Sequence, residues 1–256
     1  MVERILKALY IAAVYLLLYV PLLVTIVFSF NDSPSVNAWN GWTMQWYERL
    51  FADRSLITSA FRSLFLAASA ATCSTVIGTI IAVALHRYRF IGQKVVYGSL
   101  SVLMLSPEII LGISLVMIFV ILGIPLGFGT LLLSHTVFCF PFVTITILAR
   151  LKGVSRDLAE AAADLGASDV DTVRFVLIPL IVPAVFAGWL MSFTLSIDDV
   201  IISFFVSGKN YEILPLKIYS MVRTGIQPDV NALCAAMFFA TVFVVMFSYR
   251  LVKTKR

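Results

Sequence analysis

Charged residues are scarce in this sequence. Asp, Glu, Lys and Arg make up 13% of its 256 residues, against about a quarter in soluble globular domains. Hydrophobic residues make up 61%, and the mean hydropathy is +0.99. This balance excludes an ordinary soluble enzyme or binding domain. It predicts an all-α polytopic membrane protein, because a helix satisfies its own backbone hydrogen bonds inside a bilayer.

Residues that hold metals or perform catalysis are also rare. The three Cys stand singly in apolar segments without ligand spacing, and neither His86 nor His135 has a sequence partner that would make it a catalyst. A phosphate-binding loop is missing too, since Gly208 would need a glycine at position 203, which is Ser203. We therefore predict no catalytic site, no metal site and no cofactor bound by this chain.

Six apolar stretches are long enough to cross about 30 Å of hydrocarbon at about 1.5 Å per residue. We expect one transmembrane domain over residues 1–256. Its predicted spans are residues 9–30, 63–85, 95–123, 131–149, 181–206 and 230–249.

The net charge of +5 follows the expected topology rather than indicating nucleic-acid binding. With these spans, thirteen of the 19 Lys and Arg residues lie on one side of the membrane and six on the other. The side richer in Lys and Arg is normally cytoplasmic. Both termini and the segment of residues 150–180 are therefore predicted to face the cytoplasm.

Two spans carry features of internal packing. Ser74, Gly78 and Ala82 recur at four-residue spacing in the second span, a small-residue face that lets helices approach closely. In the third span Pro107 removes a backbone hydrogen bond, so the helix should bend there, beside Glu108.

Three acids stand in apolar surroundings: Glu108, Asp198 and Asp199. A carboxylate near the bilayer centre costs about 2.5–3.5 kcal/mol, which makes each a functional candidate. A structural ion pair or a position at the membrane interface is the alternative. If residues 181–206 form one helix, a single polar stripe should face a water-filled path; it comprises Ser192, Ser196, Asp199 and Ser203.

A path lined by carboxylates, with no Lys or Arg inside any span, attracts cations and repels anions. We therefore expect a cationic solute, held by Glu108, Asp198 and Asp199 with help from Ser196. Trp46, in the external segment, is a further candidate, because an aromatic face attracts ammonium groups. Its alternative is membership of the interfacial aromatic belt.

The segment of residues 150–180 interrupts the apolar pattern. Glu160-Ala161-Ala162 is followed by Gly166 and, nine residues after the glycine, by a stretch that ends at Pro179. Gly166 is expected to end one short helix and Ser168, with Asp171, to begin another. Such a knob can dock another protein; the alternative is an ordinary solvated hairpin.

This segment resembles the EAA loop of ABC importer permeases, with Val176 and Ile178 as conservative departures. Other stretches resemble the PotC-type permeases of bacterial spermidine/putrescine importers, in which we associate Asp with the position of Glu108. They are residues 19–23, 29–31, 84–90, 105–108, 192–199 and 211–220.

The resemblance covers nearly the whole chain. It implies type I ABC importer permease architecture, six transmembrane helices, a location in the bacterial inner membrane, and an EAA loop that couples through Glu160, Ala161, Gly166 and Pro179. It also implies a second homologous permease, two ATPase subunits that bind ATP-Mg, and a periplasmic polyamine-binding protein. The alternative from the residues is a proton-coupled secondary transporter of organic cations, with the three acids relaying protons.

Overall fold

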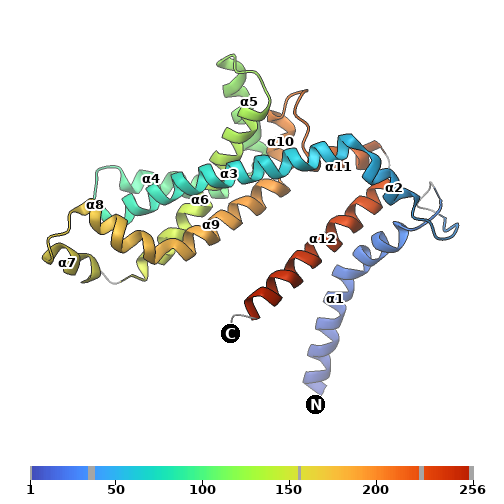
Figure 1. Ribbon diagram of the computed structural model, residues 1–256, viewed down its shortest axis with the longest axis horizontal. Coiled ribbons are helices and arrows are strands. Elements are labelled where there is room, and N and C mark those ends of the chain that lie inside the picture. Colours follow the sequence, from blue (N-terminus) through green and yellow to red (C-terminus); the bar gives the residue numbers. More distant parts are fainter. Residues whose placement is uncertain (1, 34–37, 155–156, 225–227, 254–256) are drawn as a thin grey trace. The chain divides into compact units, whose positions relative to one another are not determined.

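The computed structural model describes residues 2–33, 38–154, 157–224 and 228–253. In these residues the regular structure is helical, apart from one isolated bridge between Asn31 and Trp42. The expected all-α class is confirmed. The helices, labelled in Figure 1, are α1 (Val2–Phe28), α2 (Gln45–Ala52), α3 (Arg54–Arg87), α4 (Gln93–Leu105), α5 (Glu108–Ile121), α6 (Phe128–Lys152), α7 (Asp157–Asp164), α8 (Asp169–Asp171), η1 (Thr172–Leu177), α9 (Ile178–Asp198), α10 (Ile201–Val206), α11 (Leu214–Thr224) and α12 (Pro228–Lys253).

Four described helices are long and apolar enough to cross a membrane: Glu3–Phe28, Arg54–Arg87, Phe128–Lys152 and Asp169–Asp198. The pair α4 and α5 makes a fifth if it counts as one broken span. The sixth expected span falls in α12, where the described apolar helix is Pro228–Phe239. The described residues thus supply four to five of the six spans.

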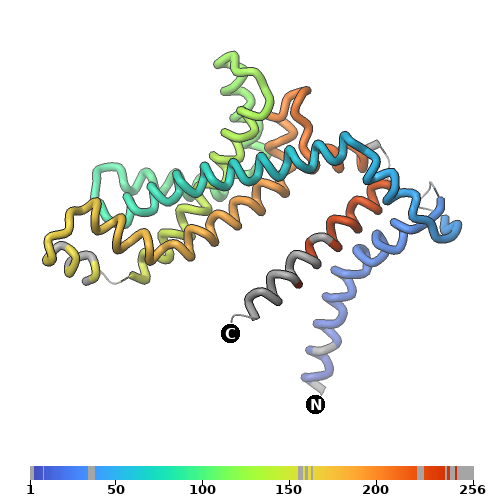
Figure 2. The backbone as a smooth tube through the Cα atoms, in the orientation of Figure 1, coloured from blue at the N-terminus to red at the C-terminus, as the bar shows by residue number. Residues whose placement is uncertain are grey.

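The chain forms two compact units. Unit 1 comprises Met1–Thr58 and Lys217–Arg256, and in it α12 packs against α1 and α2. Unit 2 comprises Ser59–Leu216 and contains α4 to α10 with most of α3. Figure 2 traces both units along the chain. Unit 2 holds the three acids singled out from the sequence.

Helix α6 is the centre of unit 2. In its most apolar stretch 61% of the residues are buried, against none in the corresponding stretch of α1. It contacts α4, α5, α9 and α10, and in Figures 1 and 2 it runs beside α3 and α9. One apolar cluster includes Val143 and Leu177, and another includes Leu131 and Ile202. Because α6 is enclosed in this way, it holds the neighbouring helices of unit 2 in place.

The small-residue face of α3 is buried, as its spacing predicts. Ser74 lies 2.7 Å from the hydroxyl of Ser192 on α9. A Cβ atom on Gly78 would lie only 3.0 Å from the Val143 side chain on α6. Close approach of α3 to both helices therefore depends on these small residues.

The prediction of one continuous helix over residues 181–206 is wrong. The helical run begins earlier, at Asp169, and ends at Asp198; α10 follows as a separate helix. Pro179 lies inside this run, two residues after the end of the wide π-type turns of Thr172–Leu177. Proline cannot bond to the carbonyl four residues back and collides with it, and a wider turn relieves the collision.

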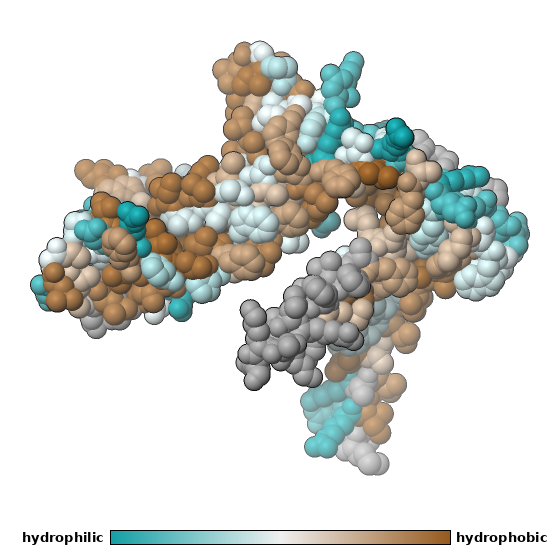
Figure 3. All heavy atoms as spheres, viewed as in Figure 1, coloured by the Kyte–Doolittle hydropathy of each residue, from teal (hydrophilic) through white to brown (hydrophobic). Residues whose placement is uncertain are grey.

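The outer surface of the long helices is apolar. In Figure 3 the visible face of unit 2 is largely brown over α3 and α9, with teal concentrated towards α8 and in the loop before α11. Exposed side chains on α5 alone include Ile109, Ile113, Met117 and Val120. Such surfaces suit lipid or another apolar helix rather than water.

Candidate functional site

The first wall of the site is the break between α4 and α5. Helix α4 ends at Leu105, Ser106 is extended with ψ 132°, and α5 begins at Glu108. The two helices meet at 110°, so Pro107 produces a sharp turn rather than the mild kink that one proline would suggest. Proline forces the residue before it out of the helical conformation. Glu108 lies in the first turn of α5, where a carboxylate is favoured by the helix dipole.

The second wall is the break between α9 and α10, which occurs at Asp199. Its backbone is extended, with φ −70° and ψ 124°. Its carboxylate accepts the backbone N–H groups of Ile202 at 3.2 Å and Ser203 at 2.8 Å, and also the Ser203 hydroxyl at 2.8 Å. Asp199 thereby satisfies two backbone N–H groups in the first turn of α10. Its side chain is buried, whereas that of Asp198 stays exposed.

The two breaks meet at a half-open hollow of about 350 Å³. It brings together Glu108, Asp198 and Asp199, although the first is some ninety residues from the others in the sequence. None of its described lining residues is Lys or Arg. The remaining lining residues are Phe138, Thr194, Leu195, Val200 and Ile201. We call this feature the acidic hollow.

The polar stripe does not face water. Ser192, Ser196 and Ser203 are at most 2% exposed, and Asp199 is 6% exposed. The stripe packs inward because α9 contacts α6 and α3. These helices supply polar partners, Ser74 on α3 and His135 on α6. The prediction that the whole stripe lines a water-filled path is therefore wrong. Of its four members only Asp199 lines the acidic hollow, and Ser196 lies behind it.

The main partner of the stripe is His135 on α6, which is 0% exposed. Its Nδ1 lies 2.7 Å from the Ser196 hydroxyl, and its Nε2 lies 2.9 Å from the Ser203 hydroxyl. The Asp199 carboxylate is 3.5 Å from Nε2. Inspection of the sequence missed this residue, because its partners are 61 and 68 positions away.

Trp46 lies in unit 1 and is 5% exposed. Its indole N–H donates to the carbonyl of Asn31 at 2.7 Å, and the guanidinium of Arg49 lies 4.9 Å from the ring centre. The face that was expected to attract a solute cation already holds a cation of the chain itself. Trp46 thus joins α2 to the end of α1.

Residues 150–180 show the expected helix end and helix start, but only the first helix of this knob is short, because the second continues from Asp169 to Asp198. Helix α7 ends before Gly166, which has φ +83°. Ser168 and Asp171 form a capping box at the start of α8. Ala161 is exposed, and the side chain of Glu160 lies outside the part of the chain that the structure describes. Asp169 pairs with Arg87 at the end of α3 at 2.6 Å, which ties the knob to the bundle.

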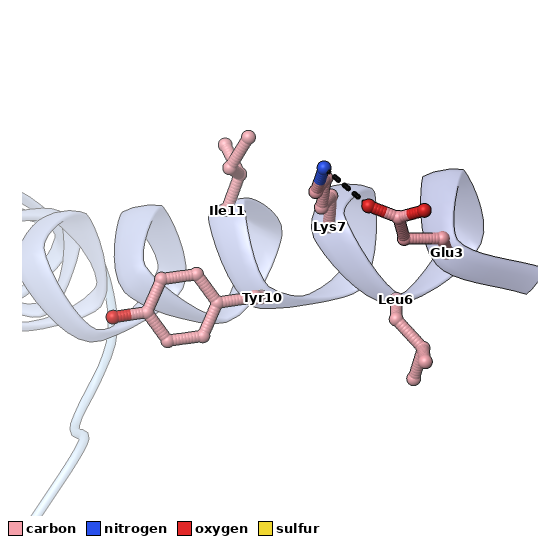
Figure 4. Close-up of a pocket in the computed structure, with 5 residues that line it drawn as sticks. All are labelled: Glu3, Leu6, Lys7, Tyr10 and Ile11. Carbon is pink, nitrogen blue, oxygen red and sulfur yellow. Dashed lines mark hydrogen bonds and ion pairs between the residues drawn. The ribbon is translucent and has the colours of Figure 1, made fainter.

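Two smaller features carry no comparable chemistry. Figure 4 shows a shallow hollow along α1, where the only drawn interaction is the pair between Glu3 and Lys7 at 2.7 Å, one turn apart. In the loop before α11, burial raises the pKa of Tyr211, although the nearby Arg62 acts in the opposite direction. The phenol is therefore neutral at pH 7.

Comparison with known proteins shows the family. Residues 74–255 match the model of the binding-protein-dependent transport system inner membrane component. The chain is 48% identical over 255 residues to the spermidine/putrescine transport system permease protein PotC of Escherichia coli strain K12, covering 100% of this chain and 97% of that protein. This chain belongs to that permease family.

A further relative agrees with this membership, and two solved structures share the fold. The permease is 39% identical over 223 residues to the putrescine transport system permease protein PotI of Escherichia coli strain K12, covering 84% of this chain and 79% of that one. Its fold resembles a chain of a bacterial ABC transporter involved in the import of the acidic polysaccharide alginate, with a TM-score of 0.76, 18% identity, and coverage of 99% and 96%. It also resembles the MetNI methionine ABC transporter, with a TM-score of 0.64, 21% identity, and coverage of 78% and 95%.

The permease is thus an inner membrane component of a transport system and not an enzyme. Its geometry unites the three predicted acids in one hollow and leaves Ser196 behind that hollow. Which of these residues meet a solute stays a prediction. So does the coupling role of Glu160, Ala161, Gly166 and Pro179.

Proposed function

We propose that this permease carries polyamines of the spermidine and putrescine class through the acidic hollow. The observation that carries the proposal is the meeting of Glu108, Asp198 and Asp199 beside apolar side chains. An ammonium group that enters the bilayer loses its hydration, and fixed carboxylates replace part of that stabilisation.

The rest of the wall suits the carbon chain of such a solute. Phe138, Leu195 and Ile201 line the same hollow and offer apolar contact to methylene groups between the charged nitrogens. An inorganic cation would gain nothing from these side chains. The names of the relatives, which specify spermidine and putrescine, support the same solute class.

We further propose six transmembrane helices in one permease domain with type I architecture, both termini being cytoplasmic. The thirteen-to-six distribution of Lys and Arg supports this orientation. Cysteine labelling tests it. A cysteine at Ser168 should resist an impermeant reagent applied outside intact cells and react once the cells are opened. Labelling from outside would contradict the proposed topology.

The same proposal includes the partners. A second homologous permease would complete the path, and two ATPase subunits would bind ATP-Mg and dock on the knob around Glu160 and Gly166. A periplasmic polyamine-binding protein would deliver the solute. Ala161 is exposed on the knob and so is accessible to a partner. The ion pair of Asp169 with Arg87 fixes the knob to α3. Membership of the family favours this arrangement over the proton-coupled transporter.

Purified complex in proteoliposomes tests the function. We expect a P-loop ATPase to copurify with the permease, and labelled spermidine or putrescine to enter only when ATP and the binding protein are supplied. Diamines should compete, while diols and dicarboxylates of equal chain length should not. Uptake that persists without ATP and stops with a protonophore would instead establish the secondary transporter.

A further inference from the structure

The buried histidine of α6 holds both sides of the break between α9 and α10. Ser196 belongs to the last turn of α9, Ser203 belongs to α10, and Asp199 lies between them. His135 reaches the two serines through different ring nitrogens, at 2.7 Å and 2.9 Å. A single imidazole therefore spans the discontinuity.

All of these bonds can form at once when the imidazole is neutral and the carboxylate is ionised. The Ser203 hydroxyl then donates its one hydrogen to Asp199 at 2.8 Å. Ser203 accepts from the Nε2–H of His135, and Nδ1 accepts from the Ser196 hydroxyl. Each buried member has a partner, as burial requires.

These hydrogen bonds join the break between α9 and α10 to helix α6. On helix α6, His135 lies between Leu131 and Phe138, two buried members of one apolar cluster of unit 2. The extended Asp199 is held by Ser203 and Ile202 on one side, and Ser203 is held by His135. The orientation of Asp199 decides where the preceding residue points, and Asp198 consequently lies in the wall of the acidic hollow.

We infer that His135 is a positioning residue of the transport path: through Ser196 and Ser203 it holds α10 and the break on α6, so that Asp198 and Asp199 present their carboxylates to the acidic hollow. This inference rests on the proposed function only in assigning a solute to the hollow. The positioning itself can be measured without any solute.

Cysteine reporters measure the positioning. Ile202 on α10 and Ala82 on α3 are both 0% exposed, so a cysteine at either position should resist a small water-soluble thiol reagent. The background lacks Cys73 and Cys234, the two native thiols that are not buried. We expect His135→Leu to make Ile202→Cys reactive while Ala82→Cys stays protected. A residue that merely supports the whole fold would expose both reporters or neither.

Conservative variants identify the atoms involved. Gln can place its amide N–H near the position of Nε2, whereas Asn reaches only towards Nδ1. We expect Gln at position 135 to protect the Ile202 reporter better than Asn or Leu does. Ser203→Ala and Ser196→Ala should expose it in part. Ser192→Ala is the matched control, because it removes an equally buried hydroxyl whose bond goes to Ser74 on α3.

Uptake by the assembled complex gives the functional readout. His135→Leu should raise the KM for spermidine about fivefold to tenfold at matched membrane levels, the factor for loss of a buried hydrogen bond. A protected Ile202 reporter in His135→Leu would overturn the inference. If that variant does not reach the membrane, protection in Ser203→Ala would overturn it equally. Exposure of the reporter with a normal KM would leave the positioning intact and count against the proposed path.

Discussion

Replacing Asp198 by Asn is expected to raise the KM for spermidine by about tenfold to a hundredfold, the effect of losing one charge-assisted hydrogen bond. The exposed carboxylate of Asp198 lines the acidic hollow and makes no hydrogen bond to other described residues. The variant should therefore reach the membrane in normal amounts. Labelled-spermidine uptake, with ATPase activity alongside, measures the change.

Glu108→Gln should behave in the same way, because Glu108 faces the same hollow from α5. Glu3→Gln is the control for loss of a carboxylate. Glu3 is exposed on α1 and pairs only with Lys7, one turn away. Normal uptake by both hollow variants would show that these acids are structural or interfacial, and the cation path would fail.

Asp199→Asn should differ from the other two. Both carboxylate oxygens of Asp199 are in use, one for Ile202 and one for Ser203. An amide keeps one acceptor and turns an N–H group towards backbone N–H groups, which costs about 1–3 kcal/mol for each unsatisfied buried group. The amount of folded protein in the membrane should fall with this variant. A raised KM in Asp198→Asn would indicate contact with the solute. A lower membrane level in Asp199→Asn would indicate that this residue stabilises the break between α9 and α10.

Local rules predicted where the two helices of the knob end and begin. Ser168 with an acid three residues later predicts a capping box, and Gly166 before it predicts a left-handed helix end. Both features are present. They could be predicted because every atom involved lies within a few residues along the chain.

Other features could not be predicted from local rules. The stripe of serines was placed on one face by assuming a continuous helix, but that helix breaks at the extended Asp199, whose carboxylate accepts N–H groups from the first turn of α10. The same residues were expected to meet water, whereas His135, far away in the sequence, supplies buried partners. Trp46 likewise finds Asn31 and Arg49 instead of a free face. Periodicity tells which residues share a side of a helix, but not what lies opposite.

The acidic hollow combines features that the sequence predicts with features that it does not predict. Pro107 predicts a bend beside Glu108, and the acids were chosen because a carboxylate in a bilayer is costly. Their meeting depends on two helix breaks in contact, since α5 packs on α10. The 110° angle at the first break could not be derived from a single proline. Chemistry thus identified the residues, and tertiary packing decided which of them lie together.

Replacing Gly166 by Val is expected to reduce ATP-driven uptake by more than about fivefold, while the permease still reaches the membrane. Gly166 has φ +83°, and a Cβ atom built on it would meet nothing within 4 Å. The penalty is therefore conformational rather than steric, about 1–2 kcal/mol for a residue forced into the left-handed region. Relief of that strain would rotate α7 against α8 and displace the face that we propose docks the ATPase.

A graded series tests this explanation. Asn tolerates the left-handed conformation better than other residues, so Gly166→Asn should retain most uptake, Gly166→Ala less, and Gly166→Val least. Gly153→Ala is the matched control, because Gly153 lies before the same knob at an ordinary φ of −87°. Recovery of the ATPase with the purified permease should follow the same order. Equal uptake and equal ATPase recovery across the Gly166 series would refute the coupling role, since the knob would then function with its two helices at any angle.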